Sequence, residues 1–535
     1  MNPLEALSDN IAIDKDKCTF CGICIETCIL DNLRMKLAPC RQACPLGVNC
    51  QGYVQLIARG EEARALELLR ETLPFPGIVG RICSQPCERR CYRREVEGEA
   101  VAIRALKRYL ADQFEKEELQ LPQIEQDTRK HVAVIGSGPA GLIAAYDLRI
   151  QGHALTVFEA ESAPGGMLRW AMPEFRLPGR ILEKELHLLE SMGIDFHCQC
   201  KIGRDKGFED LKNEFDAVII AIGCQEHDRL NIEDEDKHSV YHALPFLKEV
   251  RDGTAPEIGK KILVIGGGNV AIDSAQTALR LGAVNVTLVT LESENELPAF
   301  PWAIESALSE GVKLKCSLGN PRFIFQEGQL KGAEFKRCLA VFDESGCFKP
   351  NFDNSQLKFL EADSVIIAIG QHSDKAIFQS AGLLEDDSFT VDPLTLQTPM
   401  ENTFIAGDAF SSPSSVIEAM ASGRRAAESV NRFLNGDDIR YGRQYEGPIE
   451  TEFEIDTSRA SPEERADIPL YRLKGRGDFK EIEQGFDTAT ARREATRCYS
   501  CGQPFGKYRT CWFCLPCEVE CPHDALRVEI PYLIR

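Results

Sequence analysis

Two glycine-rich turns, each set between a short apolar run and a helical pattern, restrict the fold of this chain more than any other feature. The first unit reads HVAVIGSGPAGLIAAYDL from His131, and the following run QGHALTVFEA carries Glu159 near its end. In a βαβ unit of this kind, glycines permit a tight turn and a close approach of the backbone to a pyrophosphate, while the terminal carboxylate binds ribose hydroxyls. The residues expected at this first dinucleotide are Gly136, Gly138, Pro139, Ala140, Gly141 and Glu159.

A second unit of the same kind begins at Lys261 with the run ILVIGGGNVAIDSAQTALRLG, followed by VNVTLVTLE. A second dinucleotide is therefore expected. Two further apolar runs end in glycine turns where the chain crosses between the two folds. The residues expected at the second dinucleotide and at these crossings are Gly223, Gly266, Gly268, Asn269, Val270, Ala271, Glu292 and Gly370.

The run NTFIAGDA, after the second unit, places Gly407 and Asp408 behind a strand. An amphipathic helical pattern follows from Ser415 and Val416, and the positive end of such a helix suits a flavin ring. We therefore predict an α/β chain in which two Rossmann-like dinucleotide-binding domains are nested, as in glutathione reductase.

The distribution of the 22 cysteines divides the chain into metal-rich ends and a metal-poor middle. Ten lie between Cys18 and Cys91 and six between Cys498 and Cys521. The first ten residues lack the basic and apolar regions of a secretory signal, so we predict a cytoplasmic chain whose thiols serve metal or redox sites. No apolar run approaches the ~20 residues that span a bilayer.

Two cysteine runs with the spacing C-x2-C-x2-C-x3-C lie at opposite ends of the chain. This spacing is typical of bacterial ferredoxins, in which three thiolates hold one 4Fe-4S cluster and the fourth holds its neighbour. Zinc sites usually present paired knuckles separated by a longer gap. Because one ferredoxin contains two such runs, we predict that the termini meet as a split ferredoxin unit. The ligands are Cys18, Cys21, Cys24, Cys28, Cys511, Cys514, Cys517 and Cys521.

The middle of the chain, residues 39–435, resembles the glutamate synthase small-subunit family of flavin oxidoreductases. The resemblance rests on VAVIGSGPAGL, GGMLRWAMPEFRLP, VIGGGNVAID, ELPA, FIAGDA and SSVIEAMASGRRAA. It implies that the first fold binds FAD, that the inserted fold binds the nicotinamide nucleotide, and that Asp408 reaches the ribityl region. It adds Gly166, Met167, Leu168 and Arg176 to the expected cofactor contacts.

A helix-rich segment near the N-terminus resembles the N-terminal cluster domain of that family and of dihydropyrimidine dehydrogenase. The relatives carry an upstream R-C-x2-C element that is missing here, whereas EATRCYSC supplies one near the other end. The resemblance implies one cluster on Cys40, Cys91, Cys498 and Cys501, and another on Cys44, Cys83 and Cys87. Two candidates remain for the fourth ligand of this second cluster. One is Cys50. The other is a non-cysteine side chain, as in some relatives, but the corresponding position holds Lys107 here. Four clusters correspond to about sixteen iron atoms per chain.

The nucleotide preference follows from a departure from this family. Members that use NADPH carry paired arginines after the second strand of the nucleotide domain, where this chain has Leu291 and Glu292. A carboxylate suits two ribose hydroxyls and repels a phosphate, so we favour NAD(H) over NADP(H). The alternative is that Glu292 is a solvated loop acid and that a cation such as Arg280 selects the phosphate.

Seven segments follow from these motifs. Residues 1–36 form an N-terminal ferredoxin-like segment, 37–128 an α-helical cluster domain, 129–255 and 371–436 the two parts of the FAD domain, 256–370 the NAD(P) domain, 437–496 a linker and 497–535 a C-terminal ferredoxin-like segment.

Taken together, these features predict an oxidoreductase that exchanges electrons between NADH and a ferredoxin or partner redox subunit, within a hetero-oligomeric complex. A flavin is needed because a nicotinamide transfers two electrons and an iron-sulfur cluster accepts one. No catalytic acid or base is expected, because positioning carries hydride transfer. A net charge of −21 argues against a nucleic-acid partner. The alternatives are a glutamate synthase small subunit, a non-catalytic relay subunit and a flavin-based bifurcating module.

Overall fold

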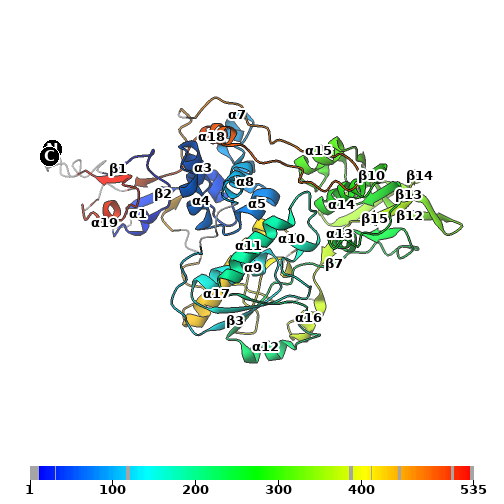
Figure 1. The fold of residues 1–535 in the computed structure, drawn as a ribbon, viewed down its shortest axis with the longest axis horizontal. Coiled ribbons are helices and arrows are strands. Elements are labelled where there is room, and N and C mark those ends of the chain that lie inside the picture. Colours follow the sequence, from blue (N-terminus) through cyan, green and yellow to red (C-terminus); the bar gives the residue numbers. More distant parts are fainter. Residues whose placement is uncertain are drawn as a thin grey trace.

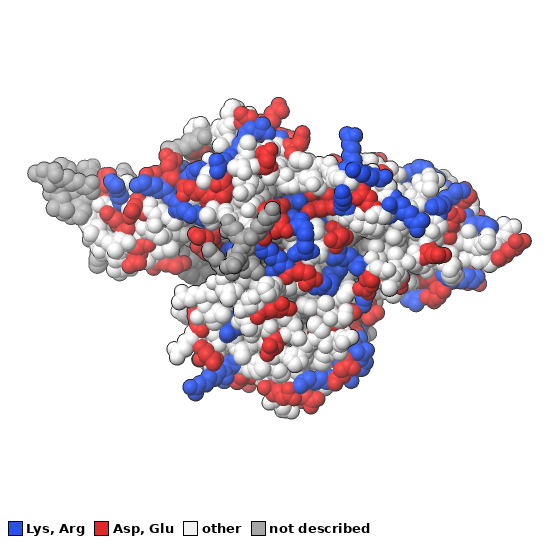
Figure 2. Space-filling model, viewed as in Figure 1, with Lys and Arg blue, Asp and Glu red and all other residues white. Residues whose placement is uncertain are grey.

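The computed structural model describes residues 11–29, 32–115, 121–384, 390–410, 412–443, 447–458, 460–507, 511 and 513–529. Figure 1 shows four parts: a small unit with β1 and α19 at one pole, a central helical domain around α3 and α8, and two α/β domains around α9 and α14. Acidic and basic side chains are interspersed over the face shown in Figure 2. Within the described ranges, no helix combines the length and the apolar character needed to cross a membrane.

The first α/β domain is built on a five-stranded parallel sheet with the order β17-β6-β3-β4-β5. Helix α17 packs on α9 so closely that a Cβ on Gly423 would lie 2.1 Å from the carbonyl oxygen of Ala140. Its elements are β3 (His131–Ile135), α9 (Pro139–Ile150), β4 (Ala154–Phe158), α10 (Met167–Trp170), α11 (Gly179–Ser191), β5 (Asp195–His197), α12 (Phe208–Glu214), β6 (Ala217–Ile220), α16 (Lys375–Ser380), β17 (Thr403–Ile405) and α17 (Val416–Asn435).

The second α/β domain also has a five-stranded parallel sheet, with the order β11-β10-β9-β15-β8. Its strands and helices are β8 (Val240–His242), α13 (Ala243–Arg251), β9 (Lys261–Ile265), α14 (Asn269–Arg280), β10 (Asn285–Val289), α15 (Pro301–Ser309), β11 (Lys313–Lys315) and β15 (Ser364–Ile367). Strand β8 lies before residue 256, where the sequence analysis placed the start of this domain. The strand was not predicted because it is short and no glycine turn follows it.

Two further sheets accompany the second domain. An antiparallel sheet of β12 (Leu318–Gln326), β13 (Gln329–Phe342) and β14 (Phe348–Glu361) extends from it. The pair β7 (Glu226–His227) and β16 (Gln371–His372) forms the crossing between the two domains.

The helical domain surrounds six of the predicted ligand cysteines. Its helices are α2 (Pro39–Gln42), α3 (Cys50–Ala58), α4 (Glu62–Arg70), α5 (Pro76–Ile82), α6 (Pro86–Arg89), α7 (Tyr92–Glu97) and α8 (Ile103–Gln113), joined by α18 (Thr488–Thr496) from the segment proposed as a linker. The rest of that segment is tied down as well, since Glu481 pairs with Arg81 at 2.8 Å and the amide of Gly477 donates to the carbonyl of Arg280 at 2.8 Å.

The described segments nearest the two ends of the chain meet at one pole of the molecule, where Figure 1 labels β1 and α19. Strand β1 (Ile11–Ile13) pairs antiparallel with β20 (Leu526–Val528). Strand β2 (Leu33–Lys36) lies between β18 (Ile449–Glu450) and β19 (Gln503–Gly506), and the helices are α1 (Ile23–Glu26) and α19 (Pro516–Val519). Both cysteine runs therefore belong to one small unit.

Candidate functional site

A cavity of about 1110 Å³ runs between the two α/β domains. It is reached by both glycine fingerprints, which lie at the carboxyl ends of their parallel strands, the usual position for ligands in such sheets. All the predicted cofactor contacts line it except Gly141 and Ala271. Those two pack helices: a Cβ on Gly141 would lie 2.0 Å from the carbonyl oxygen of Gly136, and Ala271 is fully buried.

Glu159 is held by the backbone around the first fingerprint. Its Oε2 accepts the amide of Ser137 at 3.1 Å, and its Oε1 accepts the amide of Glu161 at 2.9 Å. The residue is buried, yet it lines the cavity. A fixed carboxylate at this point fits the two hydroxyls of a ribose.

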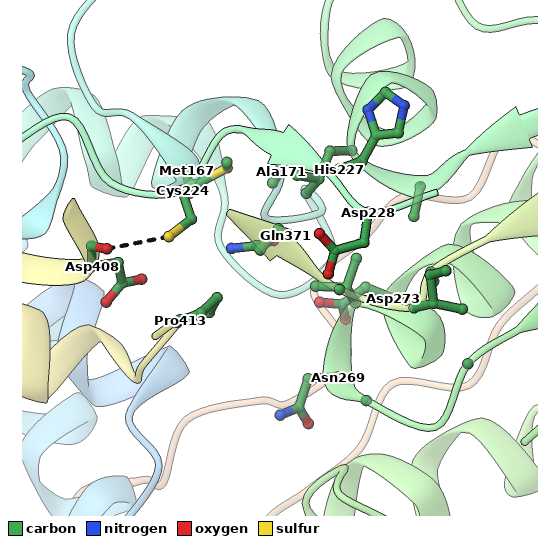
Figure 3. Close-up of a pocket in the computed structure, with 18 of the residues that line it drawn as sticks. Met167, Ala171, Cys224, His227, Asp228, Asn269, Asp273, Gln371, Asp408 and Pro413 are labelled. Atoms are coloured by element: carbon green, nitrogen blue, oxygen red, sulfur yellow. Dashed lines mark hydrogen bonds between the residues drawn. The ribbon is translucent and has the colours of Figure 1, made fainter. Parts of the chain in front are cut away.

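Asp408 follows β17 of the first domain and lies before the N-terminus of α17. Its Oδ1 accepts the amide of Ser414 at 3.2 Å, and burial raises the pKa of its carboxyl. Gly407 adopts a φ of +67°, and a Cβ there would lie 2.8 Å from the Cβ of Ala140. Cys224 donates through its thiol to the Asp408 carbonyl at 3.2 Å, the dashed line in Figure 3.

The second fingerprint faces the cavity with the carboxylate of Glu292, which forms no ion pair with a described lysine or arginine. Thr290 donates its hydroxyl to Glu292, and the amide of Ser317 donates to the Glu292 carbonyl at 2.9 Å. Arg280 is fully buried, pairs with Glu310 at 2.7 Å and lies 3.9 Å from the centre of the Phe175 ring. Arg280 is therefore not placed to meet a nucleotide phosphate.

Several residues that line the cavity belong to no motif identified in the sequence. Asp228 and Gln371 come from the crossing between the domains and Asp273 from α14, as Figure 3 shows. Phe348 and Phe352 also line the cavity, and both lie on β14 of the antiparallel sheet, which the sequence analysis did not predict. Ile82, Ser84 and Arg89 bring the helical domain to the wall of the cavity.

The cysteines of the helical domain fall into two sets. The middle set, Cys40, Cys91, Cys498 and Cys501, lines one small cavity, which Cys50 lines as well. The inner set, Cys44, Cys50, Cys83 and Cys87, comprises the thiols that interact electrostatically with the buried ammonium of Lys107. Cys83 adjoins Ser84 of the large cavity, and the Cys50 thiol contacts those of Cys40 and Cys87, so it lies between the two sets.

The ferredoxin-like unit holds two more sets, each drawn from both ends of the chain. The third set, Cys18, Cys21, Cys24 and Cys521, lines a small cavity. The outer set comprises Cys28, Cys511, Cys514 and Cys517. The first three thiols interact electrostatically with that of Cys517. This exchange of the fourth cysteine between the two runs is the ferredoxin pattern.

The thiol sets are chemically suited to iron-sulfur clusters. Burial, reinforced by neighbouring thiols, raises the pKa of Cys18 to about 11 and that of Cys24 to about 12. Packed thiols of this kind ionise only when metal replaces their protons. Among the described residues no trio of His, Cys, Asp or Glu converges on a single metal ion, whereas four-sulfur sets suit the larger 4Fe-4S core.

Two family models match the chain. Residues 130–423 match the pyridine nucleotide-disulphide oxidoreductase model, and residues 8–119 match dihydropyrimidine dehydrogenase domain II with its 4Fe-4S cluster. Both cofactor types predicted from the motifs, a flavin with its nucleotide and 4Fe-4S clusters, are confirmed at the level of the family.

Relatives of known activity match most of the chain. The NADP(+)-dependent formate dehydrogenase subunit beta of Moorella thermoacetica is 33% identical, over 87% of this chain and 70% of its own. The NADPH-Fe(3+) oxidoreductase subunit beta of Geobacter sulfurreducens is 31% identical, over 87% and 75%. The NAD-dependent dihydropyrimidine dehydrogenase subunit PreT of Salmonella typhimurium is 30% identical, over 74% and 91%. These relatives support the broad family rather than the narrower glutamate synthase resemblance.

A solved structure shares the fold. FprA from Mycobacterium tuberculosis, solved in complex with NADPH, superposes with a TM-score of 0.50 at 18% identity, over 57% of this chain and 85% of that one. The predicted pair of nested dinucleotide-binding domains is thereby confirmed.

Proposed function

The chain belongs to the pyridine nucleotide-disulphide oxidoreductase family, and from this premise we propose that it exchanges electrons between NADH and a ferredoxin or partner redox subunit. FAD in the first fold would supply the conversion of a hydride into single electrons. The observation that carries the proposal is the continuity of the large cavity, which joins both fingerprints and reaches Ser84, next to Cys83 of the inner set.

The thiol sets form an ordered series from this cavity to the outer pole. The inner and middle sets meet at Cys50, whose thiol contacts Cys40 and Cys87. Arg41 then bridges to the third set: its guanidinium interacts with Cys40, Cys50 and Cys21, and it donates to the carbonyl of Phe20 at 3.1 Å. The outer set ends the series, with Cys514 exposed. Such an order suits electron transfer between the cavity and a partner at that pole.

The residues that line the cavity would bind and orient FAD and the nicotinamide nucleotide. None of them is required as an acid or base. Glu159 would hold the FAD ribose, Asp408 the ribityl region, and the glycine turns the two pyrophosphates. With both groups bound, the cavity walls would hold the two rings next to each other and limit the access of bulk water, which would be the protein's part in hydride transfer.

NADH is the favoured nucleotide, although named relatives include both NADP-dependent and NAD-dependent proteins. The support is Glu292, which faces the second fingerprint where a 2′-phosphate would need a cation. Within the described residues, the arginines and lysines that line the cavity are Arg89, Arg176 and Arg229, of which Arg176 pairs with Asp273 and Arg229 with Asp236.

A larger complex is favoured because the formate dehydrogenase, NADPH-Fe(3+) oxidoreductase and dihydropyrimidine dehydrogenase relatives are named as subunits. The chain would then be the electron-input module, with its partner at the ferredoxin-like pole. The identity of the acceptor and the cytoplasmic location stay predictions.

The test uses the isolated full chain, purified anaerobically with its flavin and iron. Addition of NADH is expected to bleach the flavin absorbance and then reduce the clusters, with NADPH much slower. Full chemical reduction by dithionite is the control for intact cofactors. A chain that dithionite reduces and neither nucleotide bleaches would be a relay subunit, and the proposal would be wrong.

A further inference from the structure

The antiparallel sheet gives the large cavity an aromatic wall to which the proposed function assigns no role. Phe348 and Phe352 of β14 line the cavity together with Leu318 and Pro321 of β12. Phe348 is 66% exposed, and its ring packs edge-to-face against that of Phe342 on β13, with the ring centroids 6.2 Å apart. Exposed apolar side chains beside a cavity are typical of a ligand-binding groove.

This wall is fixed to the second fingerprint by backbone hydrogen bonds. The amide of Leu318, at the start of β12, donates to the carbonyl of Thr290, which directly follows β10, at 3.0 Å. The amide of Ser317 donates to the carbonyl of Glu292, the residue expected to bind the ribose, at 2.9 Å. The Glu292 carboxylate lies beside the middle glycine of the fingerprint, since a Cβ on Gly267 would lie 2.8 Å from its Oε2. The antiparallel sheet therefore begins where one ribose of the dinucleotide would be held.

Leu291 and Phe352 pack over Gly319, the second residue of β12. A Cβ on Gly319 would lie 2.1 Å from Cδ2 of Leu291 and 2.8 Å from Cε1 of Phe352, so glycine is needed to leave room for both side chains. Both line the cavity, and Leu291 directly precedes Glu292 in the chain. The two side chains thus form an apolar platform next to this carboxylate, with Phe348 four residues before Phe352 on the same strand.

The platform lies where the base of a bound nucleotide would be found. The base is joined to the same ribose whose hydroxyls the terminal carboxylate binds, so it must lie close to that carboxylate. Adenine is flat, aromatic and uncharged, and such a ring stacks well on an aromatic side chain. A nicotinamide mononucleotide has no adenosine half, so it would not reach the platform while its nicotinamide lies at the flavin.

We propose that Leu291 and Phe352 bind the adenine ring of the nicotinamide nucleotide, with Phe348 at the solvent edge of the same platform. This role rests on the proposed function in one respect, that the second fold binds a nicotinamide adenine dinucleotide. The platform recognises the half of the molecule that takes no part in hydride transfer. Binding energy from the adenine end then helps to position the nicotinamide end at the flavin.

The test measures ligand affinity by isothermal titration calorimetry, with the flavin-loaded, anaerobically purified full chain and with NAD⁺ and ADP-ribose as ligands. Phe352→Ala should weaken the binding of both ligands by roughly tenfold, because one stacking contact is lost. Phe352→Tyr keeps the ring and should restore the affinity of the wild type. The rate at which reduced nicotinamide mononucleotide bleaches the flavin should be the same in all these proteins.

Two further variants separate the loss of stacking from damage to the sheet. Phe348→Ala removes an exposed ring and should weaken ADP-ribose binding in the same direction, by less than Phe352→Ala does. Phe359→Ala is the matched control, because Phe359 lies on the same strand, is 49% exposed and does not line the cavity. This control should bind ADP-ribose as the wild type does.

An unchanged ADP-ribose affinity in Phe352→Ala and Phe348→Ala would overturn the proposal. An equal loss of affinity in Phe359→Ala, or an equal fall in the rate with the mononucleotide, would also overturn it, because the change would then not be specific to the adenine end. Failure of NADH to bleach the flavin would contradict the proposed function alone, since ADP-ribose binding requires no hydride transfer. A wild-type chain that binds neither NAD⁺ nor ADP-ribose would contradict both.

Discussion

Arg176 and Asp273 join the two dinucleotide-binding domains through an ion pair in which the Arg176 Nη1 lies 2.8 and 2.7 Å from the two carboxylate oxygens of Asp273. Arg176 precedes α11 in the first domain, and Asp273 lies on α14 of the second. Both residues line the large cavity, and Asp273 is buried. The pair therefore fixes the relative position of the domains at the point where flavin and nicotinamide would meet.

Loss of the arginine should cost more than loss of the carboxylate. Arg176→Gln leaves the Asp273 carboxylate buried and unpaired, so we expect a loss of about 3–5 kcal/mol in the free energy of unfolding. Asp273→Asn should cost less, because the more exposed arginine can meet water. Urea unfolding of both single variants and of the double variant measures the coupling. Additive losses in the double variant would mean that the pair does not act as a unit.

The glycine turns expected to bind phosphates were predictable from sequence, since the chemistry of such a turn restricts residue type. Gly136 and Gly266 need positive φ values, +100° and +139°, and Glu159 must follow the second strand at a set distance. The ferredoxin spacing likewise predicted that the termini meet. In these places the expected ligand restricts both the residue types and the fold, so the sequence pattern predicts the structure.

Other features were not predictable because packing alone determines them. Strands β12–β14 contain no sequence motif for nucleotide binding. Even so, Phe352 of β14 lines the cavity. Asp273 lies within a fingerprint helix, and its partner lies 97 residues earlier in the chain. From its place in the sequence, Arg280 was a candidate phosphate ligand. Its guanidinium instead pairs with Glu310 and lies over the ring of Phe175.

Glu185 should make the stability of the chain depend on pH. This residue of α11 accepts the amides of Gly77 and Ile78 at 2.6 and 3.1 Å, and burial raises its pKa from 4.5 to about 7. A raised carboxyl pKa means that the folded state binds the proton more tightly. The stabilisation is therefore complete below pH 4.5 and is lost as the pH rises through 7, by roughly 1.4 kcal/mol per pH unit.

Replacement of Glu185 by glutamine should remove this dependence. Apparent urea midpoints of the wild type between pH 5 and 8 should fall with pH, and those of Glu185→Gln should fall less steeply. Glu190→Gln, on the same helix but with a side chain 56% exposed, is the matched control and should follow the wild type. Parallel curves for all three proteins would show that Glu185 is not the group responsible.

Glu292 should control the choice between NADH and NADPH. Glu292→Gln removes the negative charge that would repel a 2′-phosphate and weakens the contact to the ribose hydroxyls. We expect kcat/KM for flavin reduction by NADH to fall roughly tenfold to a hundredfold, on the order of 1.5–3 kcal/mol for hydrogen bonds to a charged group. The value for NADPH should rise. Glu294→Gln, an exposed acid on the same loop, is the control and should change neither. An unchanged NADH-to-NADPH ratio in Glu292→Gln would assign this side chain to the solvated loop.

Cys514 should separate flavin reduction from electron delivery at the outer pole. It belongs to the outer set and is exposed, so its replacement by alanine should disturb the packing of the chain little. Cys514→Ala should lose up to about four iron atoms per chain while NADH still bleaches the flavin at the wild-type rate, because the large cavity is untouched. Reduction of an external one-electron acceptor by NADH should fall at least tenfold. Cys347→Ala, an exposed cysteine of the second domain outside the four thiol sets, should behave as the wild type in all three assays. Acceptor reduction that survives in Cys514→Ala would mean that electrons leave the chain before the outer set, and that a partner docks nearer the helical domain.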